Sequence, residues 1–296
     1  MIKRVIKAGI KMLAILLALA VLITAAWAWN VYANKHVRLT EYSFSHQDVP
    51  ASFDGYKILL LSDLHEAPFG EQILDIIRQE SPDVILFCGD LVQLPGHEFE
   101  QTRVIAQGVG DSIPMYAVSG NHESQNDAYW DIVGDLWDEG LYWLENDSVW
   151  LEKGDERIYL IGLQDCGRND PVDEDTLEEM AWTIEEHHPG DASVFILLLN
   201  HRANLYPFLK DTGVDLILSG HLHGGLVRLP FVKGVFGREN GETVLFPDYT
   251  YGLYDEGEAA MIVTGGCDRN PEKPRVFNQP EVVLITLKRA EAETLE

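Results

Sequence analysis

The chain has 296 residues, enough for one large α/β domain or two small ones, and its 46% hydrophobic and 24% charged residues are ordinary for a globular protein. Its formal net charge of -26 is unusual, and because an acidic surface repels phosphate backbones we expect no nucleic-acid partner, although bound cations would still allow phosphate chemistry inside a site. The three cysteines give no disulfide framework, and only a bond between Cys166 and Cys267 stays open.

The first thirty residues have the pattern of a membrane segment. Four basic residues precede an apolar run at 12–29, which only Thr24 interrupts. As a helix this run would be about 27 Å long, close to the thickness of the hydrocarbon core of a bilayer. The run is apolar on every face, which argues against a core helix of a soluble domain. We therefore expect a transmembrane signal anchor.

The basic residues also predict the orientation of this anchor. More of them precede the run than closely follow it, and basic residues mark the cytoplasmic side. Residues 1–11 are then cytoplasmic, and the main domain lies outside the cytoplasm as part of a single-pass protein of the cell membrane. The alternative is a signal peptide cleaved after Ala28, which would release a secreted protein.

Residues 30–52 are expected to form a tether and a leading strand, and residues 53–296 one main domain. In that domain apolar runs of strand length alternate with helical patterns, which predicts an α/β layered fold. The expected strands cover residues 57–61, 84–88, 115–118, 194–199 and 215–218, and the expected helices lie around residues 73–77, 99–109, 129–137 and 173–187. Residues 142–161 and 259–287 have the pattern of consecutive strands, so part of the sheet system should be antiparallel or mixed.

Each of the five expected strands ends in residues that can bind metal ions. Ligands of open α/β sheets bind outside the carboxyl ends of the strands, so these clusters could meet at one edge. Taken singly, each cluster has an ordinary alternative, such as a turn, a helix cap or a surface histidine, but the ordered set is hard to reach by chance. Its carboxylates, amide oxygen and imidazoles suit Mn, Fe or Zn ions. The set consists of Asp63, His65, Asp90, Asn121, His201, His221 and His223.

The order of these residues resembles the calcineurin-like metallophosphoesterase superfamily. The motifs that carry the resemblance are Asp63-x-His65, Gly89-Asp90, Gly120-Asn121-His122-Glu123, Asn200-His201 and Gly220-His221-x-His223, within about residues 57–287. The sequence His223-Gly224-Gly225, followed by Arg228-Leu229-Pro230-Phe231, is similar to the membrane-associated bacterial branch of YkuE- and YaeI-type phosphodiesterases. Leu226 departs from that branch, which commonly has Gln there, and this puts a substrate contact in doubt.

The resemblance implies a fold of two mixed β-sheets packed as a sandwich and flanked by helices. It also implies two divalent transition-metal ions, Mn, Fe or Zn. The implied ligands are Asp63, His65 and His223 for the first ion, Asn121, His201 and His221 for the second, and Asp90 as a bridge. His122 would bind no metal and would face the phosphoryl group as a catalytic residue. A hydroxide that bridges the two ions would attack phosphorus in line, so no covalent enzyme intermediate is needed.

We therefore expect a metal-dependent phosphodiesterase that hydrolyses a phosphodiester or pyrophosphate bond. Two alternatives stay open: a phosphomonoesterase or protein phosphatase of the same fold, and a membrane-tethered metal-binding module without activity. The sequence contains neither a Walker-type loop nor a Gly-x-Ser-x-Gly motif, so the chemistries of those motifs find no support.

Residues 226–238 reverse the acidic character of the chain directly after His223. The segment contains three basic residues and no acidic one. We expect it to line the approach of a lipid-linked or cell-envelope substrate, with Arg228 and Lys233 near lipid head groups. The alternative is a strand-loop-strand unit that packs against the core.

Overall fold

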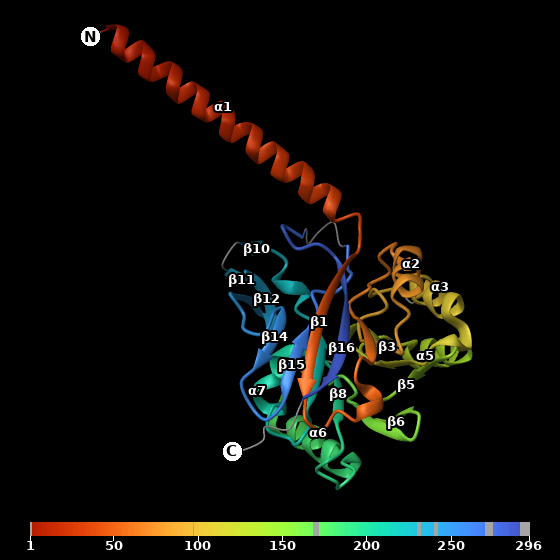
Figure 1. Ribbon diagram of the computed structural model, residues 1–296. Helices are drawn as coiled ribbons and strands as arrows, with labels where there is room; N and C mark the ends of the chain where they lie inside the picture. The colour runs from red at the N-terminus through yellow and green to blue at the C-terminus, as the bar shows by residue number, and fades with distance from the viewer. Residues whose placement is uncertain are drawn as a thin grey trace, which may run out of the picture.

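The computed structural model describes residues 2–96, 98–167, 172–229, 232–239, 242–269 and 275–290. Helix α1 (Ile2–Ala33) stands apart from a layered α/β domain (Figure 1). By length and composition α1 can cross a membrane, and its apolar window is not buried by the domain. The helix continues beyond the expected span at both ends because no proline interrupts it. Only Asn30 and Ala33, at its carboxyl end, are buried.

Two six-stranded mixed sheets form the domain, as the resemblance implies. The first sheet consists, in spatial order, of β1 (Arg38–His46), β16 (Glu281–Arg289), β2 (Lys57–Leu61), β3 (Val84–Cys88), β4 (Met115–Val118) and β5 (Leu141–Trp143). The second consists of β14 (Gly252–Asp255), β15 (Ala260–Val263), β9 (Leu216–Gly220), β8 (Ile196–Arg202), β7 (Glu156–Gly162) and β6 (Asp147–Lys153). Strands β2 to β5 are parallel, as are β7, β8, β9 and β15, so their carboxyl ends share an edge in each sheet.

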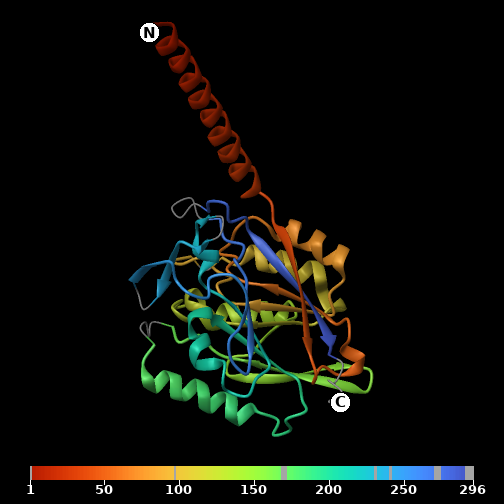
Figure 2. The same ribbon diagram turned by 60° about the vertical axis from the view of Figure 1, so that its left-hand side comes forward.

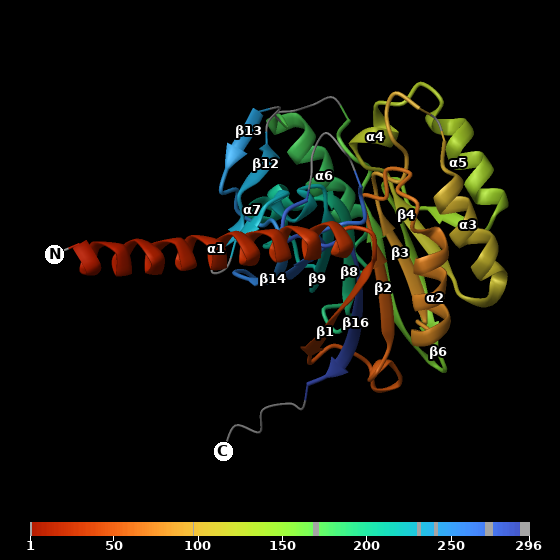
Figure 3. The same ribbon diagram turned by 90° about the horizontal axis from the view of Figure 1, so that it is seen from above.

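Helices cover the outer face of each sheet (Figure 3). The first sheet is covered by α2 (Gly70–Glu80), α3 (Glu100–Val109) and α5 (Tyr129–Asp138), and the second by α6 (Glu174–His187) and the short α7 (Tyr206–Leu209). The helices expected from the sequence are all present. Two hairpins lie outside the sheets: β10 (Arg228–Leu229) with β11 (Val232–Gly234), and β12 (Phe236–Glu239) with β13 (Glu242–Leu245).

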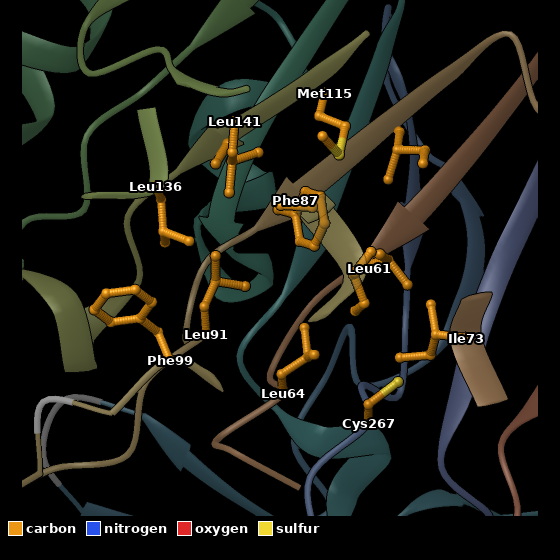
Figure 4. Close-up of a cluster of buried hydrophobic side chains, with 14 of the residues drawn as sticks. Leu61, Leu64, Ile73, Phe87, Leu91, Phe99, Met115, Leu136, Leu141 and Cys267 are labelled. Carbon is orange, nitrogen blue, oxygen red and sulfur yellow. The ribbon is translucent and has the colours of Figure 1, made fainter. Parts of the chain in front are cut away.

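The alternation of apolar side chains along the strands builds the core in layers. In β2, Ile58 and Leu60 pack between the two sheets, whereas Leu59 and Leu61 pack under the helices. Figure 4 shows this outer layer, in which Leu61 and Phe87 of the strands belong to one cluster with Leu136 of α5. Because the central strands are buried on both faces, their ends are held in fixed positions.

Residues 259–287 contain two strands, as expected, but these belong to different sheets. β15 lies in the second sheet and β16 in the first, so the chain crosses between the sheets after β15, and the described parts of this crossing segment are residues 264–269 and 275–280. It runs beside the end of β2, where the backbone N–H of Cys267 donates to the carbonyl of Asp63 (3.2 Å). The thiol of Cys267 donates to the carbonyl of Glu281, and the bond to Cys166 that the sequence left open is not formed.

Candidate active site

The polar clusters that follow the expected strands meet at one edge of the sandwich. They come from β8 itself and from the loops after β2, β3, β4 and β9. His122 and Asn121 begin the short helix α4 (Asn121–Ser124) directly after β4. All seven predicted ligands and His122 are therefore brought to one place by strand ends, as the parallel topology requires.

The first group of donor atoms comes from Asp63, His65, Asp90 and His223, which lie within 4.8 Å of one another. His65 Nδ1 donates to the carbonyl of Val92 (3.2 Å), so Nε2 faces the group. That Nε2 is buried, has no hydrogen-bond partner among the described residues, and lies 3.5 Å from Asp90 Oδ2. A buried acceptor without a partner is unfavourable unless a ligand completes it, which fits a bound cation.

The second group comes from Asp90, His201 and His221, also within 4.8 Å. His201 Nδ1 donates to the carbonyl of Cys88 (2.7 Å), which leaves Nε2 facing Asp90 Oδ2 at 3.4 Å and His221 Nδ1 at 3.2 Å. Asn121 lines the same cavity, and its buried Oδ1 has no hydrogen-bond partner among the described residues. Asp90 Oδ2 thus faces one imidazole of each group, as a bridging ligand must.

The electrostatics of the two groups suit cation binding. Burial lowers the pKa of His65 to about 4, and burial together with the charge of His201 holds that of His221 well below its ordinary value. Burial opposes the ionisation of Asp90, but His201 and His65 hold its pKa well below the usual range. Burial would lower the pKa of His201 too, yet Asp90 raises it to about 10. Neutral imidazoles beside an ionised carboxylate are the forms that bind metal, and a metal would replace the proton on His201.

Five of the seven candidate ligands have a backbone conformation that L-amino acids rarely adopt. The φ angles are 52° for Asp63, 44° for His65, 54° for Asp90, 74° for His221 and 48° for His223. Such conformations cost roughly 1–3 kcal/mol each and persist where the surrounding structure enforces them, commonly at functional sites. The backbone is therefore strained at the positions where the donor atoms converge.

His122 stands beside the two groups without belonging to either. The backbone N–H of Leu94 donates to its Nδ1 (3.1 Å), so the neutral ring carries its proton on Nε2. Burial lowers the pKa of His122, which keeps the ring neutral near pH 7. Its ring centroid lies 4.4 Å from that of His65, and its side chain lines the cavity. This arrangement offers a hydrogen-bond donor next to the first group.

The donor groups open into a cavity of about 440 Å³. Its other walls come from Leu226 and from the β12–β13 hairpin, through Phe236, Gly237 and Thr243. Part of the segment 226–238 therefore lines the approach to the site. Arg228 instead stacks on the ring of Tyr251, with its guanidinium carbon 3.3 Å from the centroid. The side chain of Lys233 lies outside the described residues, as do Pro230 and Phe231.

The carboxylate of Glu123 supports the site, a role that the sequence analysis did not assign. It is fully buried and accepts hydrogen bonds from the backbone N–H groups of Asp90 (2.7 Å), Leu91 (2.7 Å), Val92 (2.9 Å) and Gly120 (2.8 Å). It thereby joins the loops after β3 and β4. Its place in the Gly120-Asn121-His122-Glu123 motif was a usable signal.

Asp268 is a second supporting residue, and no local motif pointed to it. Its Oδ1 lies 2.9 Å from His223 Nδ1, so Nε2 of that ring faces Asp63 Oδ1 at 3.5 Å. Asp268 also pairs with the buried Arg275, which holds the pKa of Asp268 well below its usual range even though burial opposes this. A carboxylate behind a histidine is the usual way to orient a metal-binding imidazole.

Three curated proteins are similar to the chain over most of its length. The metallophosphoesterase YkuE of Bacillus subtilis is 26% identical over 266 residues, 87% of this chain and 88% of that protein. The phosphodiesterase YaeI of Escherichia coli is 26% identical over 242 residues, 78% of this chain and 82% of that protein. A transmembrane protein with a metallophosphoesterase domain from Danio rerio is 24% identical over 291 residues, 92% of this chain but 62% of that protein.

A family model settles the assignment that the geometry suggests. The calcineurin-like phosphoesterase model matches residues 56–225, more than half of the chain. The matched range begins just before β2 and ends two residues after His223, so it contains both groups of donor atoms. Strand order, converging donors and family model agree, and the chain belongs to the calcineurin-like phosphoesterase family, a family of metal-dependent phosphoric ester hydrolases.

Proposed function

We propose that the protein is a binuclear metal-dependent phosphodiesterase. The observation that carries this proposal is Asp90, whose Oδ2 faces an imidazole of each group, 3.5 Å from His65 Nε2 and 3.4 Å from His201 Nε2. In this proposal the first ion is held by Asp63, His65 and His223, the second by Asn121, His201 and His221, and both by Asp90. Transition metals such as Mn, Fe or Zn accept this mixture of imidazole and oxygen ligands.

The side chains around the proposed pair have distinct tasks. A bound pair of divalent ions would supply an activated water and neutralise charge on the phosphoryl oxygens. His122 carries a proton on Nε2, so it can donate a hydrogen bond to a phosphoryl oxygen or a proton to the leaving oxygen. Glu123 holds the backbone around Asp90 and Gly120, which keeps the bridging carboxylate in place. No side chain has to act as a nucleophile.

We propose further that the substrate is lipid-linked and reaches the site from a membrane surface. Leu226 and Phe236 give the cavity an apolar wall next to the donor groups. In Figures 1 and 2, α1 leans over the side of the domain that carries hairpins β10–β11 and β12–β13. Large apolar side chains are exposed on this side, namely Leu229, Phe236, Leu245 and Phe246. An amphiphile with its phosphoester at head-group depth suits such a surface.

The topology that accompanies this proposal follows the basic residues of the sequence. Residues 1–11 lie in the cytoplasm and residues 12–29 span the membrane. Residues 30–52 connect this span to the catalytic domain, residues 53–296, which acts outside the cytoplasm. The apolar surface of α1 and the similarity to a transmembrane protein support an anchor. The alternative is release of the domain by cleavage after Ala28. N-terminal sequencing of the mature protein tests it, because a chain that begins at Trp29 would show that cleavage occurs.

A comparison of aryl phosphodiester and aryl phosphomonoester hydrolysis tests the proposed reaction. Full-length protein in detergent micelles is stripped of metal and reloaded with Mn²⁺, with Asp90→Asn as the matched control. We expect the diester to be hydrolysed faster, and neither metal-free protein nor the control to show this activity. Preference for the monoester would favour a phosphatase. Full metal loading without hydrolysis of either substrate would favour an inactive binding module.

A double charge reversal tests the lipid-linked substrate. Arg228→Glu with Lys233→Glu should lower hydrolysis of a phosphodiester lipid in anionic vesicles by roughly thirtyfold or more, because each of the two basic residues near such a surface contributes about 1 kcal/mol. Hydrolysis of a small soluble diester should change little. Arg78→Glu with Lys288→Glu, at two exposed positions outside the segment 226–238, changes the net charge by the same four units and is the matched control. Equal losses on both substrates would contradict a lipid-facing role.

A further inference from the structure

The end of α1 and the candidate metal ligand His223 are attached to the same short piece of backbone, residues 275–278. This piece is the last part of the crossing segment before β16. In sequence, Arg275 lies 245 residues after Asn30, and Asn278 lies 55 residues after His223. None of the predicted or family-matched site residues belongs to it.

On the anchor side, two amide side chains hold this piece. Asn30 Nδ2 and Asn34 Nδ2 both donate to the carbonyl of Arg275, at 3.0 and 2.7 Å. The backbone N–H of Phe277 donates to Asn30 Oδ1 at 2.6 Å. Asn30 is 4% exposed, in a helix whose other described residues are exposed except for the half-buried Ala26 and the buried Ala33. The buried amide of Asn30 thus has partners for both its donor and its acceptor on residues 275–277, and these hydrogen bonds offset the cost of burying a polar group.

On the site side, the same piece holds His223 by its ring and by its backbone. The guanidinium of Arg275 binds Asp268 Oδ1 and the carbonyl of Gly265, and Asp268 Oδ1 contacts His223 Nδ1. The side chain of Asn278 donates to the carbonyl of His223 (2.7 Å). Backbone hydrogen bonds join Val276 to the residues that follow the ligand. The orientation of His223 therefore depends on where residues 275–278 lie.

We propose that Asn30 and Asn34 are positioning residues for the first metal ion. Their side chains hold the backbone of Arg275 and Phe277 in place. The side chains of Arg275 and Asn278 in the same piece then hold Asp268 and the backbone of His223. The junction between the anchor helix and the domain then stabilises the first group. The second group does not depend on this junction, because its His201 is held by the carbonyl of Cys88. This inference rests on the proposed metal pair and concerns how one of its two ions is retained.

The direct test is a metal titration of the full-length protein in detergent micelles. Metal-free wild type, Asn30→Ala/Asn34→Ala and the control Thr24→Ala are titrated with Mn²⁺ by calorimetry. Thr24 is exposed on α1, and among the described residues its hydroxyl donates only to the carbonyl of Ala20, so its loss leaves the junction intact. We expect two binding steps in wild type and control. In the double variant the affinity of one step should fall about tenfold, which is the lower end of the loss seen when a residue that orients a metal ligand is removed. The affinity of the other step should stay within twofold.

Two further measurements separate positioning from a general effect on folding. At saturating Mn²⁺ the double variant should recover most of the wild-type kcat for an aryl diester, because only retention of the ion is weakened. The variant Asn30→Asp keeps the acceptor for Phe277 but loses the donor to Arg275, and it should show a smaller shift of the same step. A uniform weakening of both steps, or no shift in either variant, would overturn the inference. Absence of two steps in wild type would instead contradict the proposed metal pair.

Discussion

The two groups of donor atoms differ in what holds their imidazoles. In the second group His201 lies on β8 and donates to Cys88 at the end of the neighbouring β3, so both partners belong to the sheets. In the first group His223 lies in a single turn after β9 and is held by Asp268 and Asn278 of the crossing segment. The sheets thus build the second group directly, whereas the first group depends on a segment outside the strands. The two ions should differ in how easily they are lost.

The largest effect is expected from the residue that the groups share. Asp90→Asn removes the negative charge that faces both His65 and His201, so both ions should bind more weakly. Loss of several kcal/mol of transition-state stabilisation would lower kcat by about a thousandfold or more. Metal analysis and diester kinetics on the same sample measure this. Weakening of only one ion would show that Asp90 belongs to one group.

His122→Ala should affect catalysis while leaving both groups intact. The side chain lines the cavity but is not among the clustered donors, so the metal content should equal that of wild type. Removal of a proton or hydrogen-bond donor of this kind commonly lowers kcat by about 10²–10⁴-fold. The matched variant His122→Gln, which keeps a donor, should lose less. A loss of metal in either variant would move His122 from catalysis to ligation.

Asp268→Ala should separate the two groups. Without its carboxylate the ring of His223 loses its orienting partner, and the affinity of the first ion should fall by about 10–100-fold. The second ion should bind as in wild type. Competition with a metal chelator, followed by metal counting, gives both affinities. Equal losses from the two groups would remove the distinction between them.

The smallest effect on the metal site is expected from the hydrogen bonds between Ser119 and Glu145, because they act on the stability of the fold. Both oxygens of Glu145 accept hydrogen bonds from Ser119, and burial raises the pKa of Glu145 from 4.5 to about 7. The folded state therefore binds this proton more tightly than the unfolded state, so stability from this group is present below about pH 4.5 and falls as the pH rises to about 7. Glu145→Gln should remove this fall of roughly 3 kcal/mol, seen as a flatter pH dependence of chemical unfolding of the metal-free protein. An unchanged pH profile would contradict the shifted pKa.

Much of the fold and of the site could be predicted because the signals are local. The candidate ligands follow strands with an apolar run, except His201, which lies within such a strand. Because parallel strands end at one edge of a sheet, the sequence pattern predicts that these ligands converge. Glu123 was visible in the same motif as His122. The membrane-spanning pattern of α1 was equally local, since it needs only composition and length.

The supporting residues of the first group could not be predicted in this way. Asp268 contacts His223, and Arg275 binds Asp268, across a long separation in the sequence that no motif or spacing encodes. The contacts of Asn30 with residues 275–277 join positions about 245 apart. The positive φ angles at Asp63 and His65 were also invisible, because neither residue type announces that conformation as glycine does.

The account is tested most directly by following diester hydrolysis as metal-free, full-length protein receives Mn²⁺ in measured equivalents. If Asp90 joins two ions, activity should stay low through the first equivalent, rise with the second and level off at two ions per chain. Activity that reaches its plateau at one equivalent, or that needs no metal, would contradict a binuclear phosphodiesterase built on these two groups.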